Sequence, residues 1–244
     1  MKNLILLFSF LLTFSSLSFS QTVLPINLFV DGLQTIYTKY NEFGVVKGQV
    51  KSTHSNVIRS NSNLSVNSNT LFLDATSNVQ LTRDFGIKMN TNTVSNSQSL
   101  FLDMKYFLPL STALQYKNYS VSATGNAYEI PSQLAIGMVL NSVRINFNFT
   151  PNSSGFSSAT TTVNILNRTV VNREKITTPI GTFSCWKITE DVEIKNNTVT
   201  KQKVTRWVNG DYGIIKVEVK DTSGNLKETE ILTQFQLPSL SGTK

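Results

Sequence analysis

The stretch that decides the fold of this chain is residues 177–188, TTPIGTFSCWKI. It places a Pro179-Ile180-Gly181 turn directly before a strand, because proline fixes φ and glycine supplies backbone freedom. The same stretch holds the chain's single cysteine and one of its two tryptophans. Side chains alternate along a strand, so Cys185 and Trp186 are predicted to pack on opposite faces of one sheet.

On both sides of this turn the sequence alternates polar and apolar residues in runs that end at Asn, Asp or Gly. Such runs indicate antiparallel strands joined by short turns. We predict a C-terminal meander of five strands, over residues 160–175, 183–195, 198–208, 212–220 and 225–236.

The register of the second and third of these strands follows from their turn. If Asn196 and Asn197 form a two-residue hairpin turn, paired positions sum to 393, which is 196 plus 197. This register places Trp186 opposite Trp207. It also places Glu190 opposite Lys203, a pair of opposite charges.

Earlier in the chain the pattern remains that of a β protein with one interruption. We predict a hairpin over 35–43 and 45–58, a strand pair with a loose turn over 61–74, and a strand over 79–89 with a turn at 84–86. Strands are also expected over 119–130 and 139–149. Residues 100–118 are too densely apolar for a half-exposed strand, and Pro109 suits a first helical turn. We therefore predict a short helix over 110–117.

These elements together predict an all-β fold with one short helix. Its strands would form a single, strongly curved antiparallel sheet, a half-barrel or open barrel with the helix at one end.

The N-terminal sequence indicates a secretory signal peptide rather than part of the folded domain. Lys2 precedes a short apolar run at 4–12 (LILLFSFLL), and small residues end at Ser20, which predicts cleavage between Ser20 and Gln21. Later apolar runs stay shorter than the roughly 20 residues that a membrane helix needs. We expect a signal peptide over 1–20 and a single domain over 21–244, exported to the periplasm or to the outer envelope surface.

Charge and cysteine content narrow the class of protein further. The chain carries a net charge of +7, or +6 without Lys2, and its basic residues are scattered along strands. A nucleic-acid-binding protein would cluster them on one face, so this partner is excluded. Weak attraction to anionic lipid or glycan surfaces remains compatible with the charge. A lone Cys185 excludes an internal disulfide.

The residue types that carry chemistry are sparse. His54 is the only histidine and lies in a polar run, which predicts a surface position. Neither a metal site, which needs several close His or Cys ligands, nor a phosphate-binding glycine loop is indicated. We expect no cofactor and no catalytic residue, and a hydrolase with carboxylates brought together by the fold stays as an alternative.

Several segments resemble one family. They are 103–109 (DMKYFLP), 163–168 (VNILNR), 177–185 (TTPIGTFSC), Arg206-Trp207 and 212–216 (YGIIK). In this order they resemble the TapB-like proteins, exported envelope proteins of Bacteroidetes bacteria with a domain of unknown function. Trp186 departs from the family, where a smaller side chain is usual, and so does the Asn/Ser-rich region 52–70. At greater distance the chain is similar to the LolA/LolB half-barrels, which cradle acyl chains. The resemblance implies no catalytic residues.

The sequence therefore favours a noncatalytic envelope protein whose concave sheet face binds a lipid-like or other apolar ligand. The residues predicted to line that face are Phe101, Phe107, Leu110, Leu114, Ile188 and Trp207. Plain core packing is the alternative role for each of them. The alternative function is a structural or interaction protein that contacts other envelope components without a small-molecule ligand.

Overall fold

The computed structural model describes residues 26–60, 63–92, 97–155 and 157–238. The predicted signal peptide and its cleavage site lie outside the described residues. The strands are β1 (Gln34–Asn41), β2 (Val46–Arg59), β3 (Asn63–Asp74), β4 (Val79–Asn92), β5 (Ser97–Leu102), β6 (Tyr119–Gly125), β7 (Tyr128–Pro131), β8 (Val143–Pro151), β9 (Ala159–Thr178), β10 (Gly181–Lys195), β11 (Val199–Asn209), β12 (Gly213–Lys220) and β13 (Leu226–Gln236). The helical segments are η1 (Ile26–Leu28), η2 (Met104–Phe107) and α1 (Leu110–Gln115).

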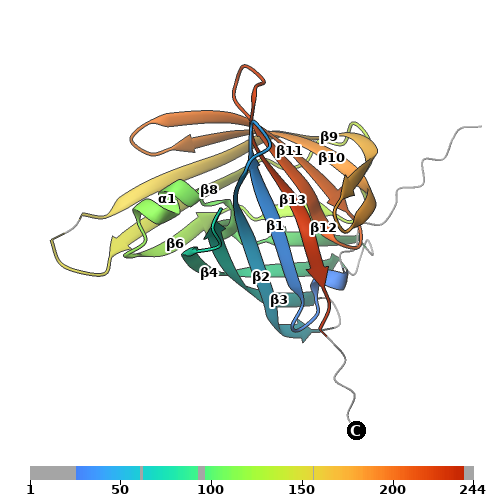
Figure 1. Ribbon diagram of the computed structural model, residues 1–244, viewed down its shortest axis with the longest axis horizontal. Helices are drawn as coiled ribbons and strands as arrows, with labels where there is room; N and C mark the ends of the chain where they lie inside the picture. The colour runs from blue at the N-terminus through green and yellow to red at the C-terminus, as the bar shows by residue number, and fades with distance from the viewer. Residues whose placement is uncertain (1–25, 61–62, 93–96, 156, 239–244) are drawn as a thin grey trace, which may run out of the picture.

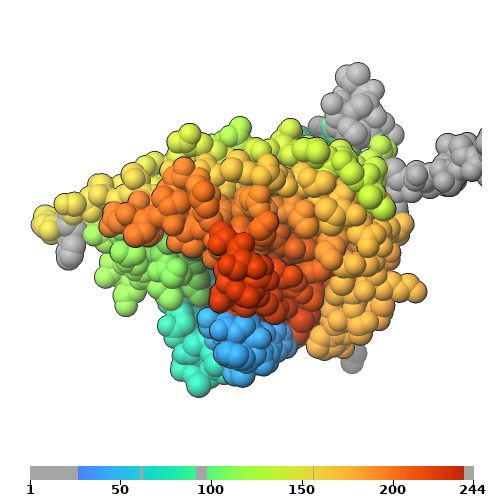
Figure 2. Space-filling view, turned by 90° about the horizontal axis from the view of Figure 1, so that it is seen from above, coloured from blue at the N-terminus to red at the C-terminus, as the bar shows by residue number. Residues whose placement is uncertain are grey.

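All of these strands belong to one antiparallel sheet, in the order β6-β8-β9-β10-β11-β12-β13-β1-β2-β3-β4-β5-β7. The predicted meander is confirmed as β9 to β13. Strands from the two ends of the chain are neighbours, because β13 pairs with β1, and the red and blue segments touch in both views (Figures 1 and 2).

The sheet curls round without closing. Its two edges are β6 and β7, which are separated along the chain by only Asn126 and Ala127. The edges therefore approach each other at that end of the strands, although they are not paired. Right-handed strand twist and bulges, such as the register shift between Lys187 and Ile188, supply the curvature. The result is the open half-barrel that the sequence predicts.

The segment between β5 and β6 contains both η2 and α1. Asp103 caps η2 by accepting a hydrogen bond from the Lys105 amide at 2.8 Å. Just beyond α1, the Tyr116 ring stacks on Phe149 of β8 at 4.3 Å between centroids. The predicted helix is confirmed, and it ends two residues earlier than expected.

Two apolar clusters lie on the two faces of the sheet. The larger cluster fills part of the concave side and includes Trp186 and Ile188. The smaller one lies on the outer side and includes Phe183, Cys185 and Trp207. Cys185 and Trp186 thus face opposite sides, as predicted. Burial raises the pKa of the Cys185 thiol to about 12, so this residue is an unreactive packing residue.

The predicted register of β10 and β11 is wrong by one residue. Trp186 pairs with Val208, and Trp207 pairs with Lys187, so paired positions sum to 394. The turn has three residues rather than two, and the Asn196 side chain stabilises it by accepting from the Thr198 amide at 2.9 Å. A shift of one residue moves every side chain to the other face. The two indole rings therefore lie on opposite faces.

Two other sequence predictions also need correction. Residues 63–74 form one continuous strand, β3, rather than a strand pair. β4 likewise runs through the expected turn at 84–86, because the Asp84 carboxylate accepts from the Asn69 side chain at 2.9 Å across the strand pair. Local polar residues thus bond across the sheet here instead of ending strands. The predicted first hairpin is confirmed as β1 and β2.

The register of β10 and β11 can be tested by cross-linking. Thr189 pairs with Thr205, and paired residues in antiparallel strands have Cα separations within the range of a disulfide. We expect Thr189→Cys with Thr205→Cys to form a disulfide on mild oxidation. Thr189→Cys with Val204→Cys, the pair given by the other register, should stay reduced. Thiol counting on the denatured proteins measures both, and the reverse pattern would contradict the register.

Candidate functional site

The concave side of the sheet encloses a cavity of about 780 Å³. Its walls come from the sheet and from the segment that contains η2 and α1. Apolar side chains that line it include Leu100, Leu102, Val163, Val192, Val204 and Val217. Exposed residues at the strand ends, Lys47, Asn196, Thr200 and Lys227, also line it, so the cavity reaches solvent at that rim.

The structure brings three of the six predicted lining residues together on the cavity wall. Phe107, Leu110 and Leu114 lie there, on η2 and α1. The other three residues lie elsewhere, for three different physical reasons.

Ile188 belongs to the concave side but is fully buried in the core cluster. Phe101 alternates with Leu100 and Leu102, which line the cavity, so its side chain faces the other way. Trp207 lies in the outer cluster, because the register differs by one residue from the predicted one.

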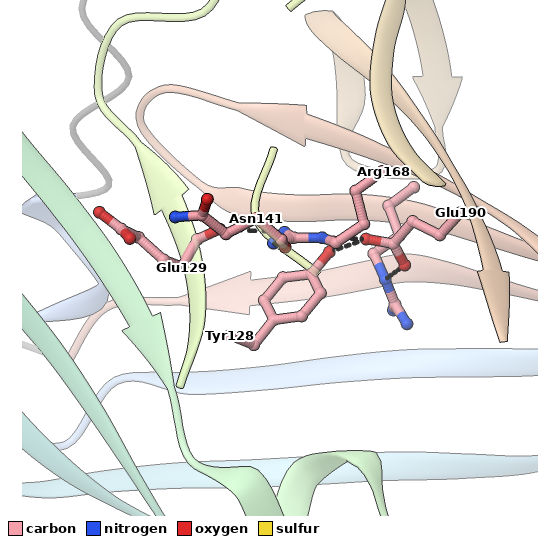
Figure 3. Close-up of polar contacts among 6 residues, drawn as sticks. Tyr128, Glu129, Asn141, Arg168 and Glu190 are labelled. Atoms are coloured by element: carbon pink, nitrogen blue, oxygen red, sulfur yellow. Dashed lines mark hydrogen bonds and ion pairs between the residues drawn. The ribbon is translucent and has the colours of Figure 1, made fainter. Parts of the chain in front are cut away.

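The most unusual feature beside the cavity is a buried carboxylate, Glu190 of β10, shared by two arginines. Its Oε1 accepts from Nε of Arg168 at 3.1 Å, and its Oε2 accepts from Nε of Arg206 at 2.9 Å. The Tyr128 hydroxyl also donates to Oε1. Figure 3 shows Tyr128, Arg168 and Glu190 converging from three strands. A buried charge is costly unless it is paired in this way.

Each of the three guanidinium nitrogens of Arg168 donates a hydrogen bond inside the protein. Its Nη1 donates to the Asn141 carbonyl at 2.8 Å and its Nη2 to the Glu129 carbonyl at 2.9 Å. Its guanidinium carbon lies 3.9 Å from the centre of the Tyr128 ring. The residue thus joins β9, β10, β7 and the segment before β8 (Figure 3).

A bulge turns these charged residues inward. Thr189 pairs with Thr169 and Asp191 pairs with Leu166, so residues 167 and 168 together oppose Glu190 alone. Asn167 takes up the bulge with a φ of 52°. Strict alternation along β9 would turn the Arg168 side chain to the outer side of the sheet. The extra residue of the bulge reverses this and turns the side chain to the concave side.

Burial and charge fix the protonation states of this network. Burial, reinforced by the Glu190 charge, raises the pKa of Tyr128 well above its usual range. Burial disfavours the charged form of Arg206, but Glu190 outweighs this and raises the pKa of the guanidinium. Tyr128 is therefore a neutral donor and Arg206 a cation.

A second ion cluster lines the cavity on β13 and β1. Nζ of Lys39 lies 3.2 Å from the Glu228 carboxylate and 3.1 Å from the Glu230 carboxylate. These are carboxylates that converge on a cavity wall, as the hydrolase alternative requires. Both carboxylates, however, are paired with the Lys39 ammonium. The geometry is that of a structural ion cluster.

The predicted surface position of His54 is wrong. The residue is buried, and its Nδ1 donates to the Leu28 carbonyl at 2.7 Å. It lines the cavity beside Ser52, Ser68 and Thr70, all on β2 and β3. The polar run around His54 therefore forms a hydroxyl-rich patch of the concave wall, and its polarity was mistaken for exposure.

Sequence reasoning missed the charged network, although a signal was available. Glu190 lies in phase with Ile188 and Val192, which face the concave side. Arg206 lies in phase with Val204 and Val208 in the same way. A charged residue in the middle of an apolar stripe indicates a buried ion pair. The predicted pairing of Glu190 with Lys203 concealed it.

Within the described ranges, no group of three or more His, Cys, Asp or Glu side chains could hold a metal ion. In the same part of the chain, no helix is long and apolar enough to cross a membrane.

The fold and the site define a half-open β protein with an internal cavity and a buried ion network. Residues 30–232 match the model of the DUF3108-like family, and the chain belongs to this family. The finer likeness to TapB-like and LolA/LolB proteins stays a prediction. No curated protein matches the chain.

Two solved structures share the fold. One is a candidate exported protein with a YmcC-like fold from Bacteroides fragilis NCTC 9343, with a TM-score of 0.70 and 17% identity. The other is a candidate lipoprotein from Parabacteroides distasonis ATCC 8503, with a TM-score of 0.72 and 17% identity. Each comparison covers 88% of this chain and 99% of the other. At this identity the likeness concerns the fold.

Removing one member of the buried network should be costly. We expect Arg168→Met to lower the free energy of unfolding by about 3–5 kcal/mol, because it leaves two backbone carbonyls and part of the Glu190 charge without a donor. The matched control is Lys201→Met, which removes an exposed pair with Glu193 at 3.7 Å and should cost less than about 1 kcal/mol. Urea unfolding measures both, and equal losses would contradict a structural role for the network.

His54 should make stability depend on pH. Burial lowers its pKa below 6.5 in the folded protein, so below about pH 6.5 the unfolded chain binds more protons than the folded one. Stability is then expected to fall as the pH drops through this range. His54→Gln should remove that decrease, because His54 is the chain's only histidine. Urea midpoints between about pH 8 and pH 5.5 test this, and identical profiles for both proteins would refute it.

Proposed function

We propose that this protein is a noncatalytic, exported binding module of the cell envelope that holds a lipid-like amphiphile inside its half-barrel. The observation that carries the proposal is the cavity of about 780 Å³ on the concave face. Ligand sites typically measure about 300–1,000 Å³ and combine an apolar wall with a few placed polar groups. The lining has this mixture, with aliphatic residues beside Tyr106, His54 and Arg206.

The architecture supports a permanent rather than an accidental cavity. Most of the described wall is strand. Buried ion pairs join β9, β10 and β11 beside the cavity, and a hydrogen bond from Arg168 to the Glu129 carbonyl holds β7. The segment that contains η2 and α1 connects β5 to β6 and is not paired as a strand of the sheet. Phe107, Leu110 and Leu114 on this segment are proposed to contact the ligand chain. Segments that lack strand pairing open at lower free energy than sheet interiors.

Export is part of the same proposal. Its support is the signal-like sequence before Gln21 and the descriptions of the two solved relatives as a candidate exported protein and a candidate lipoprotein. Lipid-like molecules are abundant in an envelope, and a water-filled compartment between membranes requires shielding of their chains.

A second candidate function is contact with other envelope components, as an interaction protein without a ligand. The β1–β2 turn favours it, because Phe43 is 80% exposed and Val45 is 60% exposed. This turn lies at the same strand ends as the basic residues Lys47 and Lys227 of the cavity rim. Retention of a specific envelope protein in a pull-down that requires Phe43, with no amphiphile bound, would favour this function over the first.

Filling the cavity should weaken binding without disturbing the sheet. Ile194 lines the cavity near the rim, so Ile194→Trp is expected to weaken binding of dansyl-labelled undecanoic acid by about tenfold or more. Lys201→Trp adds the same ring on the outer face of the neighbouring strand and should leave binding unchanged. Fluorescence titration measures both. Absence of saturable binding to the unaltered protein, or equal affinity for the two variants, would contradict an internal site.

A further inference from the structure

Arg206 is the one member of the Glu190 network that lines the cavity. The residue is 8% exposed, and its Nε is held by Glu190. In the part of the chain that the structure describes, its Nη1 and Nη2 have no hydrogen-bond acceptor. A guanidinium carries four of its five N–H groups on these two atoms. Neither atom is fully buried, and Arg206 lines the cavity, so an acceptor that enters the cavity can reach these N–H groups.

Two aromatic rings lie beside the Arg206 guanidinium and restrict its position. Its central carbon lies 5.5 Å from the Phe107 ring centre and 5.6 Å from the Tyr128 ring centre. Tyr106, the residue before Phe107, also lines the cavity, and its hydroxyl has no acceptor or donor among the described residues. Burial raises the pKa of Tyr106 to about 12, so this hydroxyl keeps its proton and can donate.

The charges around Arg206 do not balance within the network. Arg168 and Arg206 share the single Glu190 carboxylate, so two positive charges meet one negative charge. Glu230 is on the same row of the sheet, separated from Arg206 by Val217, but its carboxylate is paired with Lys39 at 3.1 Å. Lys39 also pairs with Glu228, so the positive excess at Arg206 is local, and over the two clusters together the charges cancel.

We propose that the Nη1 and Nη2 edge of Arg206 and the Tyr106 hydroxyl bind the anionic head group of an amphiphile. A carboxylate or a phosphate monoester supplies the acceptor, because either accepts two parallel N–H bonds from a guanidinium. The chain of the amphiphile lies on the apolar wall, which includes Leu100, Leu102, Val192 and Val204. This assignment rests on the proposed function and adds the chemical class of the ligand.

The first experiment compares head groups on one chain length. Isothermal titration of the purified protein with dodecanoate, dodecyl phosphate and dodecan-1-ol separates head-group binding from chain binding. We expect at least one of the two anions to bind about tenfold more tightly than the alcohol. Acetate and inorganic phosphate, titrated alone, should bind far more weakly, because the apolar wall then contributes nothing.

The second experiment changes the head-group residues. Arg206→Gln should remove the preference for anions over the alcohol, and Tyr106→Phe should reduce it several-fold. Tyr106→Phe removes one hydroxyl only, so it keeps the test valid if Arg206→Gln does not fold. The matched control is Arg168→Gln, which changes the other arginine on Glu190; each nitrogen of Arg168 donates inside the protein, and the residue does not line the cavity. It should lose stability and keep the preference.

The outcomes distinguish failure of the head-group site from failure of amphiphile binding itself. Equal affinity for all three dodecyl compounds, or an unchanged preference in Tyr106→Phe and Arg206→Gln, overturns the head-group site and leaves amphiphile binding standing. Saturable binding of acetate or phosphate as tight as that of the dodecyl anions makes the site a free-anion site and overturns the amphiphile assignment. Failure of every dodecyl compound to bind overturns the proposed function itself.

Discussion

The shared carboxylate of Glu190 is the interaction on which the rest of this half-barrel depends. A carboxylate buried with two arginines and a tyrosine hydroxyl is tolerable only while all of its partners stay in place. Through Arg168 the same group fixes β7 and the segment before β8 against the long strands β9 and β10. β7 is an edge strand, so this anchorage holds one open edge of the sheet against the opposite wall. The ion network thereby does what strand pairing does in a closed sheet.

Holding the walls apart has a consequence for the interior. An open sheet of this curvature could collapse and fill its concave side with aliphatic side chains. Two charged groups resist this collapse, because ions lose hydration and partners in an apolar core. One consists of Arg168, Glu190 and Arg206, and the other of Lys39 and Glu230. The cavity and the buried charges are thus two aspects of one arrangement.

The sequence predicted the parts of this arrangement that follow from local periodicity. The meander, the first hairpin and the helix after Pro109 could be read from it, because alternation and turn residues act over a few positions. The register of β10 and β11 could not, because Asn196 supports two-residue and three-residue turns alike, and one residue reverses the faces of Trp186 and Trp207. Of the predicted wall residues, those on the helical segment line the cavity, since that segment has no partner strand. Arg168 was missed because its inward direction depends on a bulge at Asn167, a feature of paired strands rather than of a single sequence window.

The central claim is that the space inside the half-barrel is a binding site rather than a packing defect. The most direct measurement is mass spectrometry of the protein purified from its own cell envelope under non-denaturing conditions, followed by extraction and identification of whatever it carries. The account predicts a bound anionic amphiphile in near-stoichiometric amount, released when the protein is unfolded and reduced in a variant whose cavity is filled. A protein that leaves its envelope without any such molecule, and that gains none on exposure to envelope lipids, would contradict the account.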